Sequence, residues 1–219
     1  HNFYRQCYLQ TGGWIPMGSL TQPVELGDFL QISSQTPRVL GNIINLRLVE
    51  EVLVSGSLPV EGDDWKVSSG VTQKYCMTEQ IANDVQELEY YSKQQLVFSE
   101  HGSFIFHGQN PQCRLILNWS QFEDDITLKL TQSSFSFREL YVVTAVMEME
   151  NVGLAIAEQQ GAELELSAQV SANSLFEVFG HDSVRAVQSH FIHSFERHVQ
   201  EKSYFFKAKK LILSDKKRE

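Results

Sequence analysis

The chain has 219 residues, of which 42% are hydrophobic and 21% charged, as in an ordinary globular domain, and we expect one domain over residues 1–219. Its net charge of −9 at pH 7 argues against general nucleic-acid binding. The chain has neither an apolar run of about 18 residues, as a transmembrane helix needs, nor the charged start and apolar stretch of a signal peptide.

The first half of the chain predicts short strands and one helix. Residues 3–15 indicate a first strand that ends at Gly12 and Gly13. A second strand is expected at residues 43–55, and a third at residues 71–77, after a loop at 56–70. Thr78 can cap a helix over residues 78–92, in which Ile81, Val85 and Leu88 recur at helical spacing. Residues 96–98 and 103–106 predict a hairpin.

A second helix is expected after a strand at residues 113–119. Ser120 is a candidate N-cap, and Glu123 three residues later would complete a capping box. Phe122, Ile126 and Leu130 then recur every four residues, which predicts one buried stripe.

Two long amphipathic strands follow. Residues 140–156 are rich in β-branched side chains, and residues 161–173 alternate between apolar and polar without interruption. This is the length and pattern of a strand that crosses a bilayer, and the two strands, joined near residues 159–161, predict a membrane hairpin. The alternative is an ordinary antiparallel sheet with one wet face.

Near the C-terminus, residues 182–200 fit either a helix or a strand, and strand is favoured; residues 203–213 predict a terminal strand. On that strand Lys207 and Lys209 share one face, and Lys210 lies on the other. These lysines are candidates for contact with anionic lipid head groups. Alternatively, they keep an edge strand from pairing with other chains.

Three cysteines, Cys7, Cys76 and Cys113, are odd in number and widely spaced, which favours a reducing compartment over a disulfide framework. Cys76 and Cys113 have apolar neighbours and are expected in the core. Common catalytic motifs are absent, so no enzyme and no cofactor is predicted. His190, His193 and His198 cannot face one metal ion from one helix or strand, and no metal site is expected.

The resulting fold class is α+β: a twisted, mainly antiparallel sheet with a few peripheral helices and long amphipathic strands able to form membrane hairpins. The residues expected to span the membrane are Val146, Met147, Met149, Leu154, Ile156, Leu164, Leu166 and Val170. Glu148, Glu150, Glu163 and Glu165 would then make the lumen wall negative.

Five strings, in order from residue 7 to residue 213, point to a known family. They are the N-terminal pattern of Cys7, Gly13, Ile15, Pro16, Ser19 and Leu20, then L-G-N-I-I-N-L at 40–46, S-E-H-G-S-F-I-F-H-G at 99–108, F-R-E-L-Y-V-V-T-A-V at 137–146, and S-Y-F-F-K-A-K-K-L-I-L at 203–213. In this order they resemble the pore-forming domain of gasdermins, and the first three are similar to the bacterial branch.

The resemblance implies a cell-death effector without catalytic residues. Gasdermins are released by proteolysis, oligomerise in a membrane and extend amphipathic hairpins into one shared β-barrel pore. Bacterial members resemble antiphage defence effectors cut by a caspase-like protease. The implied partners are therefore membrane lipid, further copies of the chain and an activating protease, with no nucleic acid. The implied location is the cytoplasm when inactive and the inner membrane when active.

The resemblance also singles out Cys7 as a candidate for fatty acylation, although six residues precede it; the alternative is a buried strand residue. Family members carry an inhibitory segment after the last strand, whereas only residues 214–219 follow here. Two possibilities stay open: a cleaved, pore-competent product, or inhibition by another route. The alternative function is a soluble α+β binding or scaffold protein, and the third is an enzyme with dispersed catalytic residues.

Overall fold

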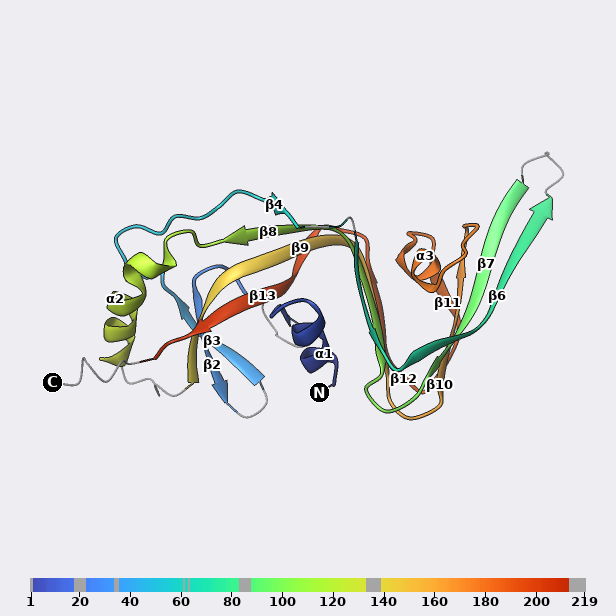
Figure 1. The fold of residues 1–219 in the computed structure, drawn as a ribbon, viewed down its shortest axis with the longest axis horizontal. Coiled ribbons are helices and arrows are strands. Elements are labelled where there is room, and N and C mark those ends of the chain that lie inside the picture. The colour runs from blue at the N-terminus through green and yellow to red at the C-terminus, as the bar shows by residue number, and fades with distance from the viewer. Residues whose placement is uncertain are drawn as a thin grey trace. The chain divides into compact units, whose positions relative to one another are not determined.

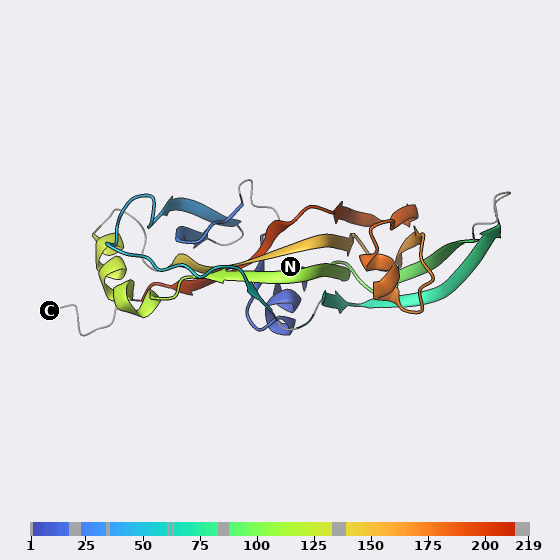
Figure 2. The ribbon, with the colours of Figure 1, turned by 90° about the horizontal axis from the view of Figure 1, so that it is seen from above.

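The computed structural model describes residues 2–17, 23–33, 36–60, 62, 64–82, 88–132 and 139–212 (Figure 1). It confirms the α+β class, since antiparallel sheets dominate and three helices accompany them (Figures 1 and 2). Two compact units share the chain, and strands β8 (Phe104–Leu115) and β9 (Leu140–Ala157) run through both. Unit 1 comprises residues 1–13, 61–111 and 149–202, and unit 2 comprises residues 14–60, 112–148 and 203–219.

Unit 2 is built on the sheet path β1-β13-β9-β2-β3, in which β1 pairs with β13, β2 with β3 and β2 with β9, each pair antiparallel. Its strands are β1 (Ile15–Pro16), β2 (Asp28–Ser33), β3 (Thr36–Asn42) and β13 (Lys202–Lys210), and β4 (Leu58–Pro59) pairs with β8. The predicted terminal strand is confirmed by β13. Residues 43–55 were expected to be a strand, which is wrong: they start with turns closed by Asn42, whose side chain accepts from the backbone N–H groups of Ile44 and Asn45.

Helix α2 (Trp119–Thr131) confirms the predicted apolar stripe. Phe122, Ile126 and Leu130 are all buried in the core of unit 2. The predicted cap is wrong, because the N-cap residue is Asn118 rather than Ser120. Asn118 instead accepts from the backbone N–H of Leu53 and donates to the carbonyl of Glu51, which fixes that extended segment beside the helix.

Unit 1 begins with helix α1 (Asn2–Gln10), where the sequence analysis expected a strand. Phe3 and Cys7, four residues apart, are its buried residues, so helical spacing outweighs the strand preference of the aromatic residues. The Phe3 ring packs edge-on against Phe104 of β8, with ring centroids 4.9 Å apart. Gly12 and Gly13 end the helix with positive φ values, as is common at helix C-termini.

Two groups of four antiparallel strands make up the rest of unit 1. The first is β5 (Asp64–Ser69), β8, β9 and β12 (Ile192–His198), in that order. The second is β6 (Val71–Ala82), β7 (Leu88–Phe98), β10 (Ala162–Ala168) and β11 (Arg185–His190). Figures 1 and 2 both show β6 and β7 side by side. The strands expected at 71–77 and 140–156 are confirmed. The strand expected at 161–173 is confirmed over residues 162–168 only, and the segment 182–200 is extended, as favoured, but forms two strands, β11 and β12.

The helix expected over residues 78–92 is wrong, because the described part of this segment belongs to β6 and β7; residues 83–87 lie outside the described residues. The predicted hairpin at 96–98 and 103–106 is also wrong, since β7 and β8 belong to different sheets. A short helix, α3 (Leu175–Gly180), was not predicted. Its signal is present in the sequence: Ser174 and Glu177 form a complete capping box.

Candidate functional site

The four strands of the first group in unit 1, β5, β8, β9 and β12, connect to the four strands of the second group along one line, which we call the fold line. It consists of Gly70 between β5 and β6, residues 99–102 between β7 and β8, residues 158–161 between β9 and β10, and Phe191 between β11 and β12. Gly70 and Phe191 both have positive φ. Beyond this line, β5-β8-β9-β12 continues as β6-β7-β10-β11, so the unit contains four long strands folded back on themselves (Figure 1).

The two central strands cross the fold line through matching turns. Ser103 N–H donates to the carbonyl of Glu100, and Ala162 N–H donates to that of Gln159. Each turn has a glycine with positive φ just before its last residue, Gly102 at 80° and Gly161 at 74°. Glycine adopts this conformation without steric cost, so both reversals are encoded locally.

The pairing register of these two strands is the same on both sides of the fold line. Phe98 faces Ala162 in β7 and β10, while Ser103 and Ala157 are hydrogen-bonded partners in β8 and β9. Residues 99–102 and 158–161 lie between these pairs, an equal number on each strand. Straightening both strands would therefore keep this residue pairing, while the hydrogen bonds from Gly102 N–H to Ala157 and from Gly161 N–H to Phe98 would be replaced. We call β7–β8 and β9–β10 together the central ribbon.

The fold line also changes which face of each strand is apolar. On one side, Leu96, Phe98, Leu164 and Leu166 pack into one cluster; on the other, Ile105 joins that cluster and Phe104 packs on α1. Side chains alternate along a straight strand. A straightened ribbon would thus carry its even-numbered residues, among them Phe98, Phe104, Ile156 and Leu164, on one face.

The opposite, odd-numbered face of the ribbon beyond the fold line is polar and paired. Gln95 donates to Glu163 at 2.9 Å, and Lys74 lies 3.8 Å from the same carboxylate. Glu165 accepts a hydrogen bond from Tyr75 and contributes, after burial, to the raised pKa of that phenol. Glu163 and Glu165 therefore share the polar face, as expected for a lumen wall.

Residue number alone does not assign Glu148 and Glu150 to a face relative to Glu163 and Glu165. The alternation along β9 changes phase at Asn151, which has a φ of 50°, and Met149 and Val152 both lie on the Cβ side of Gly108. Glu148 is bound by Arg114, whose Nη2 lies 3.0 Å from its Oε1.

The residues expected to span a membrane are buried or half-buried here. Val146, Met147, Met149, Leu164 and Leu166 are buried, and Leu154, Ile156 and Val170 are half-buried. Their predicted hairpin is wrong: β9 and β10 belong to different sheets and are successive halves of one folded strand. Met149 lies on the same face of β9 as Val152, since both approach the Cβ position of Gly108.

Cys7 lies on α1 with no exposed surface, and burial raises the pKa of its thiol from 9.0 to about 12. Acylation of this thiol requires α1 to move away from β8. Cys113 is buried as expected, whereas Cys76 is exposed, contrary to the sequence analysis.

We expect thiol reagents to distinguish these cysteines. At pH 8 a rise of the pKa from 9 to 12 lowers the thiolate fraction about a thousandfold. Iodoacetamide should therefore modify exposed Cys76 first, and Cys7 only after denaturation, as read by peptide mass spectrometry. Equal rates for Cys7 and Cys76 in native buffer would contradict the burial of α1.

The lysines expected at head groups lie on β13. Lys207 Nζ lies 4.8 Å from the centre of the Trp14 ring, and Lys210 Nζ lies 6.0 Å from that of Tyr141. Lys209 is exposed. β13 lies between β9 and β1, although β1 pairs only with Phe205 and Phe206. Among the described residues, the part of β13 that carries the lysines has no strand paired with it on the β1 side, so head-group contact and edge protection both stay predictions.

Within the described residues, no group of three His, Cys, Asp or Glu side chains is placed to hold a metal ion. No helix in the described part of the chain has the length and apolar character needed to span a membrane. Ser19, Leu20 and residues 213–219 lie outside the described residues. No protein-family model matches the chain, and no curated protein has a similar sequence.

Proposed function

We propose that the protein is a membrane pore-forming effector that opens at the fold line and inserts the half of the sheet beyond it. The supporting observation is the unchanged register of the central ribbon. Because Phe98/Ala162 and Ser103/Ala157 have the same register, opening keeps the residue pairing of the central ribbon. The outer strands have only Gly70 and Phe191 at the fold line, so each would shift by four residues against the ribbon. The closed fold buries the apolar face, and the open one presents it.

The inserting segment has the length that a bilayer requires. Ala162, Leu164, Leu166, Ala168, Val170 and Ala172 form the apolar face. β10 itself has seven residues, and residues 169–172 would have to extend it in the inserted state to reach the length of about nine to eleven residues that a tilted transmembrane strand needs. Glu100 and Glu158 would fall on this face at the fold line, which therefore belongs at head-group level, where a charge costs little.

Two polar residues on this face, Ser92 and Gln94, make side-chain hydrogen bonds in the closed fold that opening would break. Ser92 Oγ donates to the carbonyl of Val170 at 2.6 Å and accepts from Ala172 N–H. Gln94 Nε2 donates to the carbonyl of Ser174 at 3.0 Å. They hold residues 170–174 against β7, so they stabilise the closed state over the inserted one.

Four strands from one chain cannot close a wide barrel, and an open sheet edge in lipid leaves backbone groups without partners. The active form is therefore a homo-oligomer in which neighbouring copies pair at their edges. The resemblance to bacterial gasdermins adds further parts to the proposal. A caspase-like protease releases the protein, which moves from the cytoplasm to the inner membrane and has a role in antiphage defence. Cys7 is acylated, and Lys207, Lys209 and Lys210 contact lipid.

Dye leakage from liposomes tests this proposal. We expect the 219-residue chain to release an encapsulated dye from vesicles that contain phosphatidylglycerol, with a steep dependence on protein concentration because several copies form each pore. Vesicles of phosphatidylcholine alone should release less dye, since the basic end of β13 faces no anionic lipid there. Intact vesicles and no bound protein with either lipid would refute the proposal and favour a soluble binding protein.

A further inference from the structure

Helix α3 lies between the two halves of the folded sheet and contacts both. On one side Gln94 of β7 donates to Ser174, directly before the helix. On the other side, a Cβ added to Gly153 of β9 would lie 2.8 Å from the Phe179 ring, so the ring rests on the glycine. Opening at the fold line separates these halves, and therefore requires α3 to leave one of them.

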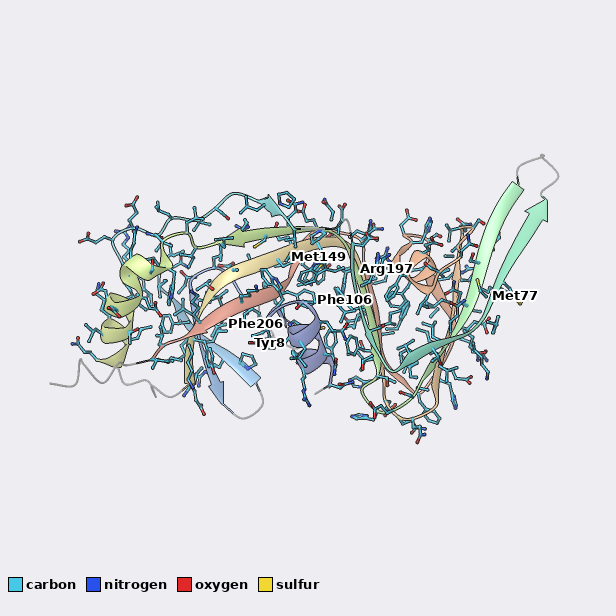
Figure 3. The ribbon with its side chains drawn as sticks, in the orientation of Figure 1. Tyr8, Met77, Phe106, Met149, Arg197 and Phe206 are labelled. Carbon is cyan, nitrogen blue, oxygen red and sulfur yellow. The ribbon has the colours of Figure 1, made fainter. Side chains whose placement is uncertain are left out.

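Four residues, one from each of the adjacent strands β5, β8, β9 and β12, lie in one row across the sheet and hold α3 against it. We call them the latch row: Lys66 of β5, His107 of β8, Gly153 of β9 and Arg197 of β12. Lys66 Nζ lies 5.8 Å from the centre of the Phe176 ring. Arg197 Nη2 donates to the carbonyls of Gly180 at 3.4 Å and His181 at 3.2 Å. Arg197 is labelled in Figure 3.

His107 is at the centre of this row, and its side chain is 2% exposed. Gly180 at the end of α3 lies directly on the imidazole, because any Cβ there would overlap the ring. Nε2 lies 3.5 Å from Asp64 Oδ2, while Nδ1 is buried without a hydrogen-bond partner. The site fits a neutral ring: a proton added at Nδ1 would have no acceptor and would be buried.

Among the described residues, the charged groups around the ring come from two strands. β5 contributes Asp64 and Lys66, and β12 contributes Arg197, whereas β9 and α3 present Gly153, Phe176 and Gly180. Burial lowers the pKa of His107 below its ordinary 6.5; Asp64 opposes this, and Lys66 and Arg197 add to it. Protonation would place a third cation in a row with one carboxylate.

We propose that His107 makes α3 an acid-released latch, which holds the folded sheet closed at neutral pH and frees it when the imidazole is protonated. This inference rests on the proposed function for its role, but the latch itself is a property of the protein in solution. It assigns a regulatory input, local acidity at a membrane surface, to the transition from closed to open.

The direction of the effect follows from the two protonation equilibria. When α3 is released, His107 meets water and titrates near 6.5, whereas in the latched state its pKa is lower. The released state therefore binds more protons as the pH falls below 6.5. Its population relative to the latched state rises by up to about tenfold per pH unit, and it levels off below the latched pKa. Above pH 7.5 the latch is insensitive to pH.

Amide hydrogen exchange of residues 175–181 between pH 5 and pH 8, corrected for the intrinsic exchange rate, measures release of α3. We expect its protection factor to fall by up to about tenfold per pH unit below 6.5 in the parent chain. His107→Phe, which keeps a ring under Gly180 but cannot be protonated, should show no fall. His193→Phe, at an exposed histidine of β12, is the matched control and should behave like the parent.

A second variant tests the same charge balance without changing the ring. Asp64→Asn removes the only carboxylate found at His107 among the described residues, which lowers the latched pKa further. In Asp64→Asn we expect the protection factor of residues 175–181 to keep falling at pH values where the parent has already levelled off. The total fall should therefore be larger than in the parent. Protection that is independent of pH in the parent, or an unchanged pH dependence in His107→Phe, would overturn the latch.

These outcomes are separate from those of the pore proposal. Loss of protection in acid supports the latch even if vesicles never leak, in which case only the pore proposal fails. Leakage with equal rates at pH 5.5 and 7.5, together with protection that does not change with pH, refutes the latch and leaves the pore proposal standing.

Discussion

A disulfide across one turn of the fold line is expected to abolish leakage completely. Ser99 Oγ and Ser103 Oγ lie 3.4 Å apart on either side of the turn between β7 and β8. In a straight strand the two Cα atoms would be about 13 Å apart, at about 3.3 Å per residue. A disulfide tolerates a Cα separation of at most about 7 Å. Oxidised Ser99→Cys/Ser103→Cys protein therefore cannot straighten.

We expect this variant, made with Cys76→Ser to remove the exposed native thiol, to give background dye release when oxidised and full release after reduction. The matched control places the disulfide at Gln95 and Glu165, which face each other in β7 and β10. Opening keeps that pair, so the Gln95→Cys/Glu165→Cys protein should leak in both redox states. Full leakage by the oxidised Ser99→Cys/Ser103→Cys protein would contradict opening at the fold line.

Local patterns in the sequence predicted the long strands but not their partners. Alternation in residues 162–168 and β-branching in residues 140–156 identify β10 and β9. The turn at Gly161 looks the same in the sequence whether it closes a hairpin or folds one strand back. The choice is made by Phe98, which pairs with Ala162 from more than sixty residues away. No property of the turn itself carries that information.

The site residues that the sequence analysis missed depend on similar long-range placement. His107 is one histidine in a mixed string, and only its burial, with Gly180 packed directly on the ring, lowers its pKa. Helix α3 did have a local signal in Ser174 and Glu177, but it directly follows the alternating residues 161–173. The mistaken helix at residues 78–92 is the reverse case: its helical spacing is overridden by pairing with β7.

An arginine on the apolar face of the inserting segment is expected to reduce leakage strongly without unfolding the closed protein. Leu164 and Leu166 are unsuitable positions, because both are fully buried and a charge there would disrupt the core. Val170 is on the same face but only half-buried, and the adjacent Gln169 is exposed on the other face. Val170→Arg and Gln169→Arg therefore add the same charge one residue apart.

In the inserted state Val170→Arg would place its charge against lipid, at a cost that rises from about 1 kcal/mol near the interface to about 2–4 kcal/mol at the midplane. Every subunit bears this cost, so we expect at least a tenfold loss of dye release at a fixed protein concentration. Gln169→Arg faces the lumen and should leak like the parent. Thermal unfolding of both variants, within a few degrees of the parent, shows that the closed fold survives. If folded Val170→Arg released dye as fast as Gln169→Arg, this face of the segment would not contact lipid.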